Sequence, residues 1–148
     1  FFFILSVFLL GPYRLMEHIM KRLQKLTIVT LFSIFTTPAF SDVSVHVLDT
    51  NKGLPGQNIE VQFFEKNGDK WKHLSTKTTN EKGRINNFEL GDSTEYRAVF
   101  NVKSFFKKQN LDTFYNFIPV DFKVENKEAH YHIPLLLSPY AYSTYRGN

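Results

Sequence analysis

The chain has 148 residues, of which 43% are hydrophobic and 16% aromatic, and a formal charge of +4. This length and composition suit a single globular domain. The sequence has no cysteine, which excludes a thiol nucleophile, a cysteine-ligated zinc site and a disulfide scaffold. Four basic residues against one acid in the first 41 positions supply +3 of the charge, so the rest is near +1. Beyond the pair Lys107 and Lys108 there is no basic stripe, and we predict no nucleic-acid partner.

The first forty residues differ in composition from the rest of the chain. Residues 1–10 are almost wholly apolar and begin without methionine, so we expect 1–19 to be an upstream extension that is not structured. Residues 20–41 are typical of a secretory signal peptide, with a basic start, an apolar run and Ala39 and Ser41 before the cleavage point. A membrane anchor is the alternative, but a span needs about 20 apolar residues and this run is shorter. We therefore predict a periplasmic domain over 42–148 that has no membrane contact after cleavage.

Residues 42–148 contain short segments in which apolar and polar positions alternate, which is typical of strands with one buried face. Clusters of Gly, Pro and Asn separate them and predict turns. The one plausible helix is short and covers 102–108. We predict strands around 43–48, 59–63, 71–77, 84–90, 95–100 and 118–124, and two more within 130–148. The fold class is therefore all-β, an antiparallel β-sandwich of about eight strands with one short helix.

Histidines stand out on the predicted strands. His130 and His132 share one face of the last long strand, because successive side chains of a strand point to opposite sides. The other face of that strand carries the apolar residues at 131, 133, 135 and 137. His46 lies on the less apolar face of the first strand and would join the other two if the two strands were neighbours.

The sequence contains no Gly-x-Ser-x-Gly elbow, no His-Glu-x-x-His helix, no phosphate-binding loop and no dinucleotide fingerprint. Imidazole, guanidinium and phenol groups remain. Three histidines can hold a catalytic zinc ion, can act without metal as proton acceptors, or can be ordinary surface residues of a sheet. Arg84, which follows a turn glycine, and Arg146, near the end of the chain, could clamp a carbonyl or carboxylate or simply aid solubility. Spacing alone leaves these alternatives open.

Two stretches resemble the signatures of a known family. Residues 46–56, His-Val-Leu-Asp-Thr-Asn-Lys-Gly-Leu-Pro-Gly, with Ile59 and Val61, resemble the amino-terminal signature of the transthyretin family. Residues 131–144, Tyr-His-Ile-Pro-Leu-Leu-Leu-Ser-Pro-Tyr-Ala-Tyr-Ser-Thr, resemble its carboxy-terminal signature. The two matches lie at opposite ends of the predicted domain, so the resemblance covers nearly all of it.

Within that family, the chain is similar to the enzyme branch that hydrolyses 5-hydroxyisourate and not to the hormone carriers. The residues that carry this similarity are a first-strand histidine, an arginine after the middle turn, a His-Tyr-His strand and a Tyr-Arg-Gly ending. They are His46, Arg84, His130-Tyr131-His132 and Tyr145-Arg146-Gly147. Asn148 departs from the serine that ends the family motif, and we expect altered kinetics at most.

The resemblance implies a homotetramer with active sites at subunit interfaces, no cofactor and no metal. It implies opening of the 5-hydroxyisourate ring by water to give 2-oxo-4-hydroxy-4-carboxy-5-ureidoimidazoline in urate degradation. The implied catalytic residues are His46, Arg84, His132 and Tyr145, of which His46, Arg84 and Tyr145, with Arg146, would bind the substrate. A non-catalytic protein that binds a small ligand is the alternative, and a zinc hydrolase using His46, His130 and His132 is a second.

Overall fold

The computed structural model describes residues 16–21 and 42–147. The chain divides into two units, and residues 16–21, the described part of the first, form a short helical segment. The predicted extension over 1–19 and signal peptide over 20–41 otherwise lie outside the described residues, as does Asn148. No helix within the described part of the chain is long and apolar enough to span a membrane.

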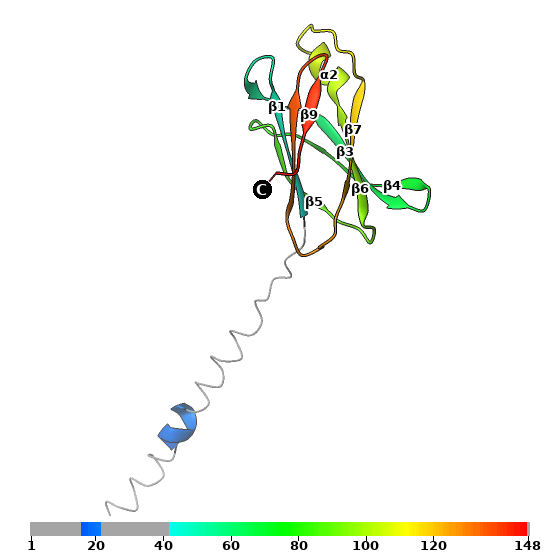
Figure 1. Ribbon diagram of the computed structural model, residues 1–148. Helices are drawn as coiled ribbons and strands as arrows, with labels where there is room; N and C mark the ends of the chain where they lie inside the picture. Colours follow the sequence, from blue (N-terminus) through cyan, green and yellow to red (C-terminus); the bar gives the residue numbers. More distant parts are fainter. Residues whose placement is uncertain (1–15, 22–41, 148) are drawn as a thin grey trace, which may run out of the picture. The chain divides into compact units, whose positions relative to one another are not determined.

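The second unit is a sandwich of two β-sheets with one short helix (Figure 1). One sheet has the order β2-β1-β8-β9, with β5 also paired to β1, and the other has the order β4-β3-β6-β7. The first sheet contains β1 (Asp42–Asp49), β2 (Leu54–Pro55), β5 (Arg84–Glu89), β8 (Tyr131–Leu137) and β9 (Tyr142–Thr144). The second contains β3 (Glu60–Asn67), β4 (Lys70–Thr78), β6 (Glu95–Asn101) and β7 (Phe117–Lys123), and the helix is α2 (Val102–Lys107).

The predicted all-β sandwich is confirmed, and each predicted strand and the helix are present. The additional strand is β2, two residues inside the predicted turn cluster, which pairs with the end of β1. Its pairing is possible because Gly53 adopts a positive φ of 68° and lets the chain reverse tightly after β1.

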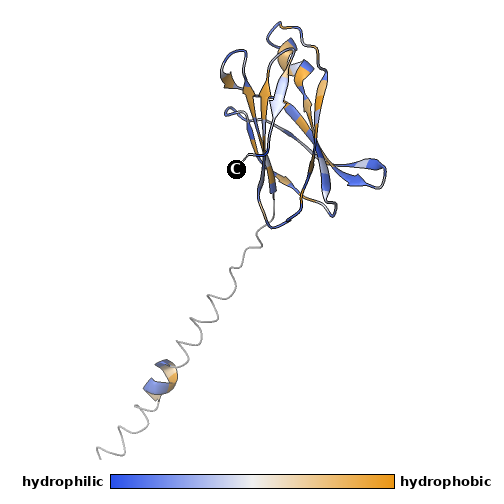
Figure 2. Ribbon diagram, in the orientation of Figure 1, coloured by the Kyte–Doolittle hydropathy of each residue, from blue (hydrophilic) through white to orange (hydrophobic). Residues whose placement is uncertain are grey.

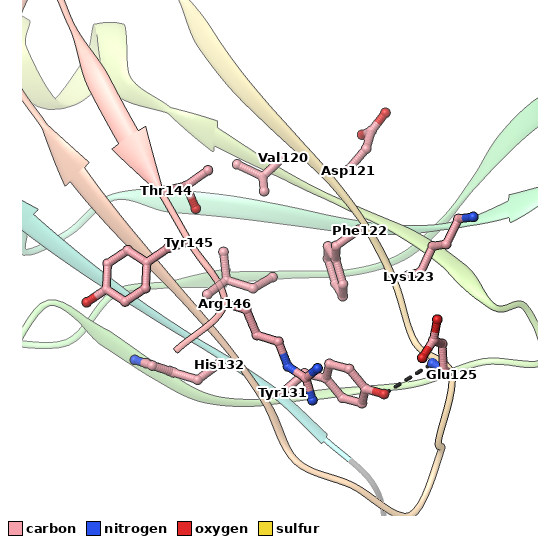
Figure 3. Close-up of a pocket in the computed structure, with 11 residues that line it drawn as sticks. Val120, Asp121, Phe122, Lys123, Glu125, Tyr131, His132, Thr144, Tyr145 and Arg146 are labelled. Atoms are coloured by element: carbon pink, nitrogen blue, oxygen red, sulfur yellow. Dashed lines mark hydrogen bonds between the residues drawn. The ribbon is translucent and has the colours of Figure 1, made fainter. Parts of the chain in front are cut away.

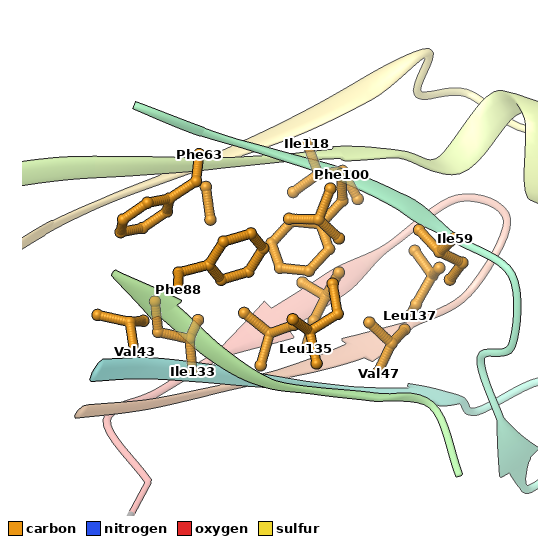
Figure 4. Packing of buried hydrophobic residues seen from close by; sticks show 14 of the residues in the cluster. Val43, Val47, Ile59, Phe63, Phe88, Phe100, Ile118, Ile133, Leu135 and Leu137 are labelled. Carbon is orange, nitrogen blue, oxygen red and sulfur yellow. The ribbon is translucent and has the colours of Figure 1, made fainter. Parts of the chain in front are cut away.

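The core lies between the sheets and is built from the apolar positions of the alternating strands (Figure 4). Hydrophobic positions recur along both sheets (Figure 2). Val43, Val45 and Val47 of β1 are each fully buried, as predicted from their spacing. Burying a side chain of this kind stabilises the fold by about 1.5–3 kcal/mol. The alternation therefore fixes which face of β1 turns inward and leaves His46 on the opposite face.

One strand pair departs from an antiparallel sandwich. β1 and β8 run parallel, and their register pairs Ser44 with His132 and His46 with Pro134. Parallel neighbours need a long crossover connection, and the whole second sheet supplies it here. This pairing brings the two ends of the domain sequence side by side, and it sets the distance between His46 and His132.

Candidate active site

Three adjacent strands place two imidazoles and a guanidinium on the same face of the first sheet. His46 of β1 lies directly opposite Arg84 of β5, and directly paired residues point to the same side. His132 of β8 pairs with Ser44, two residues before His46, and so shares that face. The rings of His46 and His132 are stacked with centroids 6.4 Å apart and an interplanar angle of 26°. The first and penultimate strands of the sandwich, β1 and β8, are therefore neighbours, which is the condition for His46 to join His132.

A tight turn between β4 and β5 sets the position of Arg84. The Asn80 side-chain oxygen accepts hydrogen bonds from the backbone N–H groups of Lys82 and Arg84, at 2.9 and 3.0 Å. Gly83 has a positive φ of 70°, and a Cβ there would collide with the carbonyl oxygen of Val47. Only glycine fits this close approach, which presses the start of β5 against β1. The Arg84 side chain itself is exposed on the open face of the sheet.

The Ser44 hydroxyl links His132 of β8 to His130, the residue that precedes β8. It lies 2.7 Å from Nδ1 of His132 and 2.9 Å from Nε2 of His130. His130 in turn contacts the Asp42 carboxylate through Nδ1 at 2.6 Å. Ser44 is 8% exposed, so its hydroxyl is held by these partners and not by bulk water. The four side chains form one continuous hydrogen-bonded chain along β1 and β8.

The carboxy-terminal segment closes one side of the site. After β9 the chain returns to β8, where the Gly147 N–H donates to the His132 carbonyl at 2.9 Å. A Cβ at Gly147 would collide with Cδ2 of His132, so the glycine allows the chain to lie against the imidazole. Tyr145 is 58% exposed. Gly147 is therefore a positioning residue for the carboxy-terminal segment, because it lets that segment lie against the His132 ring. The Tyr-Arg-Gly motif by itself does not indicate this contact.

The Arg146 side chain lies over the ring of Tyr131. Its guanidinium carbon lies 5.2 Å from the centroid of the Tyr131 ring (Figure 3). Tyr131 belongs to the buried face of β8, whereas His132 belongs to the opposite face. The structure therefore does not bring the Arg146 guanidinium to the face that carries His46 and Arg84. Its predicted contact with substrate stays a prediction.

A cavity of about 310 Å³ opens at the edge of the sandwich, between β7 and the carboxy-terminal segment (Figure 3). Its lining includes His132, Tyr145 and Arg146, together with Tyr131 and Phe122. His46 and Arg84 do not line it. His132 is thus the residue shared by the open sheet face and this cavity, and Tyr145 and Arg146 lie beside it.

The environment of the site favours neutral imidazoles. Burial lowers the pKa of His46 below 6.5, and the charge of Arg84 lowers it further, against a hydrogen bond to the Lys82 backbone. Burial likewise lowers the pKa of His132, with further lowering by Arg84, His46 and His130. A neutral imidazole has a free lone pair, so both rings can accept a proton near neutral pH.

The three histidines do not form a metal centre in the described part of the chain, where no group of three His, Cys, Asp or Glu side chains converges on a common point. Ser44 lies between His130 and His132 and occupies the nitrogens that face each other. The zinc alternative therefore finds no support in the arrangement of His46, His130 and His132.

The residues proposed from sequence are thus brought together in part. His46, Arg84 and His132 share one face, Tyr145 lines the same cavity as His132, and the exposed Arg146 lies over the Tyr131 ring. Sequence reasoning missed Ser44 and Asp42. The period-two pattern placed Ser44 on the face of His46, which was the available signal, but its partners on β8 depend on the strand register.

Comparison with known proteins identifies the family of the chain. Residues 43–147 match the model of the HIUase/Transthyretin family. A 5-hydroxyisourate hydrolase of Salmonella dublin is 40% identical over 109 residues, covering 72% of this chain and 80% of that protein. The 5-hydroxyisourate hydrolase of Mus musculus is 33% identical over 114 residues, covering 73% of this chain and 96% of its own.

Solved structures show the same fold. The Klebsiella pneumoniae 5-hydroxyisourate hydrolase aligns with a TM-score of 0.64 and 27% identity, covering 74% of this chain and 94% of that chain. Sea bream transthyretin in complex with thyroxine aligns with a TM-score of 0.65 and 28% identity, covering 71% and 93%. The near-equal scores show that the fold alone does not separate hydrolase from carrier. With the family model matched across the whole described sandwich, the chain belongs to the HIUase/Transthyretin family.

Proposed function

We propose that this protein is an enzyme, a hydrolase that opens the ring of 5-hydroxyisourate to give 2-oxo-4-hydroxy-4-carboxy-5-ureidoimidazoline, within urate degradation. The similarity to curated 5-hydroxyisourate hydrolases supports this function. The observation that carries it at the level of residues is the grouping of His46, Arg84 and His132 on one sheet face. Two proton-accepting imidazoles beside a permanent cation suit an attack by water on an electron-poor carbonyl.

In the proposed mechanism His132 takes a proton from water as the water oxygen bonds to a ring carbonyl carbon. The negative charge that develops on the carbonyl oxygen is stabilised by the Arg84 guanidinium, which is permanently charged. The ring C–N bond then breaks, and the proton held by His132 passes to the leaving nitrogen. His46 binds the substrate and takes part in proton transfer, because its ring lies beside that of His132. No step requires a cofactor.

Tyr145 is proposed to hold a second carbonyl of the substrate. Its exposed phenol can donate a hydrogen bond, and it lines the same cavity as His132. Arg146 is proposed to shape the wall of the site at the edge of the sandwich. The contact of its guanidinium with the Tyr131 ring would anchor the segment that carries Tyr145 and Gly147.

The test is an absorbance assay of freshly generated 5-hydroxyisourate with and without purified protein. We expect decay well above the spontaneous rate, unaffected by a chelator. Retention of the compound without faster decay would favour the alternative, a binding protein of the carrier type. Loss of activity in chelator, restored by zinc, would favour the metal alternative.

The protein is further proposed to act as a homotetramer. Edge strands leave backbone groups open to pairing, and β7 and β9 are the edges of their sheets. Large exposed hydrophobic side chains cluster near these edges: Phe114, Phe117, Tyr140, Tyr142 and Tyr145. Light scattering after size-exclusion chromatography should give about four times the mass of one processed chain. A monomer that is fully active would contradict the proposal.

Export to the periplasm is proposed from the sequence of residues 20–41 alone. The expected result is a periplasmic protein whose amino terminus, determined by Edman degradation or mass spectrometry, is Asp42. Recovery in the cytoplasmic fraction with residues 20–41 attached would contradict it.

A further inference from the structure

Ser44 is the centre of a chain of hydrogen bonds that runs from a carboxylate to the proposed base. Asp42 contacts Nδ1 of His130 at 2.6 Å, Nε2 of His130 contacts the Ser44 hydroxyl at 2.9 Å, and that hydroxyl contacts Nδ1 of His132 at 2.7 Å. The distances of 2.7 and 2.9 Å lie in the range of well-formed hydrogen bonds, and the 2.6 Å contact with the carboxylate is slightly shorter. Among the described side chains, none hydrogen-bonds Nε2 of His132, which leaves this nitrogen for the site.

The direction of each bond follows from the number of protons available. A carboxylate only accepts, so Nδ1 of His130 donates to Asp42. A neutral His130 then has its lone pair on Nε2, and this nitrogen accepts from Ser44. The hydroxyl has a single proton, and with that proton directed to His130 it can only accept from the other side. Nδ1 of His132 must therefore carry the hydrogen and donate to Ser44.

We propose that Asp42, His130 and Ser44 are positioning residues that hold His132 in the tautomer with hydrogen on Nδ1 and the lone pair on Nε2. In this tautomer His132 is a base toward the open site, which is what the proposed hydrolysis requires. The catalytic meaning of the chain rests on the proposed function, whereas the tautomer itself is a property of the free protein. Ser44 would also keep its bond to the imidazolium that forms when His132 takes up a proton, because Nδ1 retains its hydrogen throughout.

The same chain has a second arrangement with the opposite result. If Nε2 of His130 carries a hydrogen, it donates to Ser44, and the hydroxyl proton turns toward Nδ1 of His132. His132 then has its hydrogen on Nε2 and can donate to the site but cannot accept. In a neutral His130 the Asp42 carboxylate selects against this arrangement, because it holds the single ring hydrogen on Nδ1. His46 and Arg84 face His132 from the same sheet, and Tyr145 and Arg146 lie beside it on the carboxy-terminal segment. Among the described residues, none of these four side chains bonds to the Ser44 hydroxyl.

The tautomer can be measured directly by long-range ¹⁵N–¹H NMR on protein labelled with ¹⁵N-histidine, without substrate. We expect His132 of the parent protein to show hydrogen on Nδ1. Asp42→Ala and Ser44→Ala should shift His132 toward hydrogen on Nε2, and Ser44→Thr, which keeps the hydroxyl, should preserve the parent state. His73, whose Nε2 bonds Thr76 at 2.8 Å far from this chain, supplies an internal reference that should not change.

Kinetics give a second readout. Ser44→Ala should lower kcat by about 10- to 100-fold with little change in KM, which is less than the loss from removing the base itself. Ser44→Thr should restore most of kcat. A purely structural role for Ser44 would lower Tm and leave the tautomer of His132 unchanged in the folded fraction.

Hydrogen on Nε2 of His132 in the parent protein would overturn the proposal, and this result does not depend on whether any variant folds. An unchanged tautomer and unchanged kcat in folded Ser44→Ala would also overturn it. A parent protein with hydrogen on Nδ1 that does not accelerate 5-hydroxyisourate decay would support the positioning chain and refute the proposed function. The two failures are thus distinguishable.

Discussion

The arginines on the outward faces of the two sheets differ in their ion-pair partners. On the second sheet Arg97 of β6 forms a two-pronged ion pair with Asp121 of β7, at 2.5 and 2.7 Å, and its guanidinium lies 4.2 Å from the centroid of the Trp71 ring. On the first sheet the Arg84 guanidinium has no carboxylate partner among the described residues. Its charge acts instead on the imidazoles of His46 and His132, whose protonation it opposes.

This difference separates a structural face from a functional one. The ion pair raises the pKa of Arg97 and lowers that of Asp121, so each partner stabilises the charge of the other. Arg84 instead lowers the pKa of His46 and His132 and keeps a charge available for a ligand. An unpaired guanidinium beside partly buried imidazoles does not stabilise the fold. Such an arrangement is typical of a site that binds a substrate.

The largest expected effect comes from removing the proposed base on the functional face. His132→Ala should lower kcat for 5-hydroxyisourate by at least about 10²-fold, because general base catalysis typically contributes about 10²–10⁴-fold. Absorbance kinetics with background decay subtracted measure it. The matched control is His73→Ala, an exposed histidine of β4, which should leave kcat unchanged. Equal rates for His132→Ala and the parent protein would refute the assignment.

The next effect comes from reversing the unpaired charge. Arg84→Glu should lower kcat/KM by about 10²–10³-fold, since it removes a group proposed to stabilise the developing oxyanion. Tyr145→Thr should act in the same direction with a smaller loss, because one hydrogen bond to substrate disappears. The same decay assay measures both. Full activity in both variants would remove these residues from the site.

The pH dependence of kcat/KM and of the free energy of unfolding tests the effect of Arg84 on His132. With the pKa of His132 below 6.5, the acid limb of kcat/KM should have its midpoint below pH 6.5, and Arg84→Gln should move that midpoint upward. Stability follows the same sign: the unfolded chain binds more protons than the native protein between the folded pKa values and 6.5. The free energy of unfolding should therefore fall as pH decreases through that window, which urea titrations at several pH values test. An acid limb above pH 6.5 would contradict it.

The smallest effect is expected on the structural face. Arg97→Ala, which removes the ion pair and does not touch the lining of the cavity beside His132, should reduce the free energy of unfolding by only about 0.2–1 kcal/mol, because the pair is partly exposed and screened by solvent. Activity should not change. Urea denaturation and the decay assay together measure this. A large loss of activity in Arg97→Ala would contradict the distinction between the two faces.

The alternation of valines in β1 and of apolar residues in β8 was enough to determine the sandwich class, since burying one face of a strand decides its orientation locally. The same alternation determined that His46, His130 and His132 point away from the core. The motif resemblance added Arg84 and Tyr145 as partners. These inferences rest only on local sequence patterns or on a family motif. The observed strands, and the face shared by His46 and His132, are consistent with them.

Tertiary structure decided the rest. The parallel pairing of β1 with β8 joins residues more than 80 positions apart, and its register places Ser44 between His130 and His132. The contact of Gly147 with the His132 ring and the stacking of Arg146 on Tyr131 depend on how the chain returns after β9. A one-residue change of register would move every side chain to the other face, and nothing in the local pattern specifies which partner strand is chosen. Sequence thus determined which groups face the solvent, and the fold determined which of them touch.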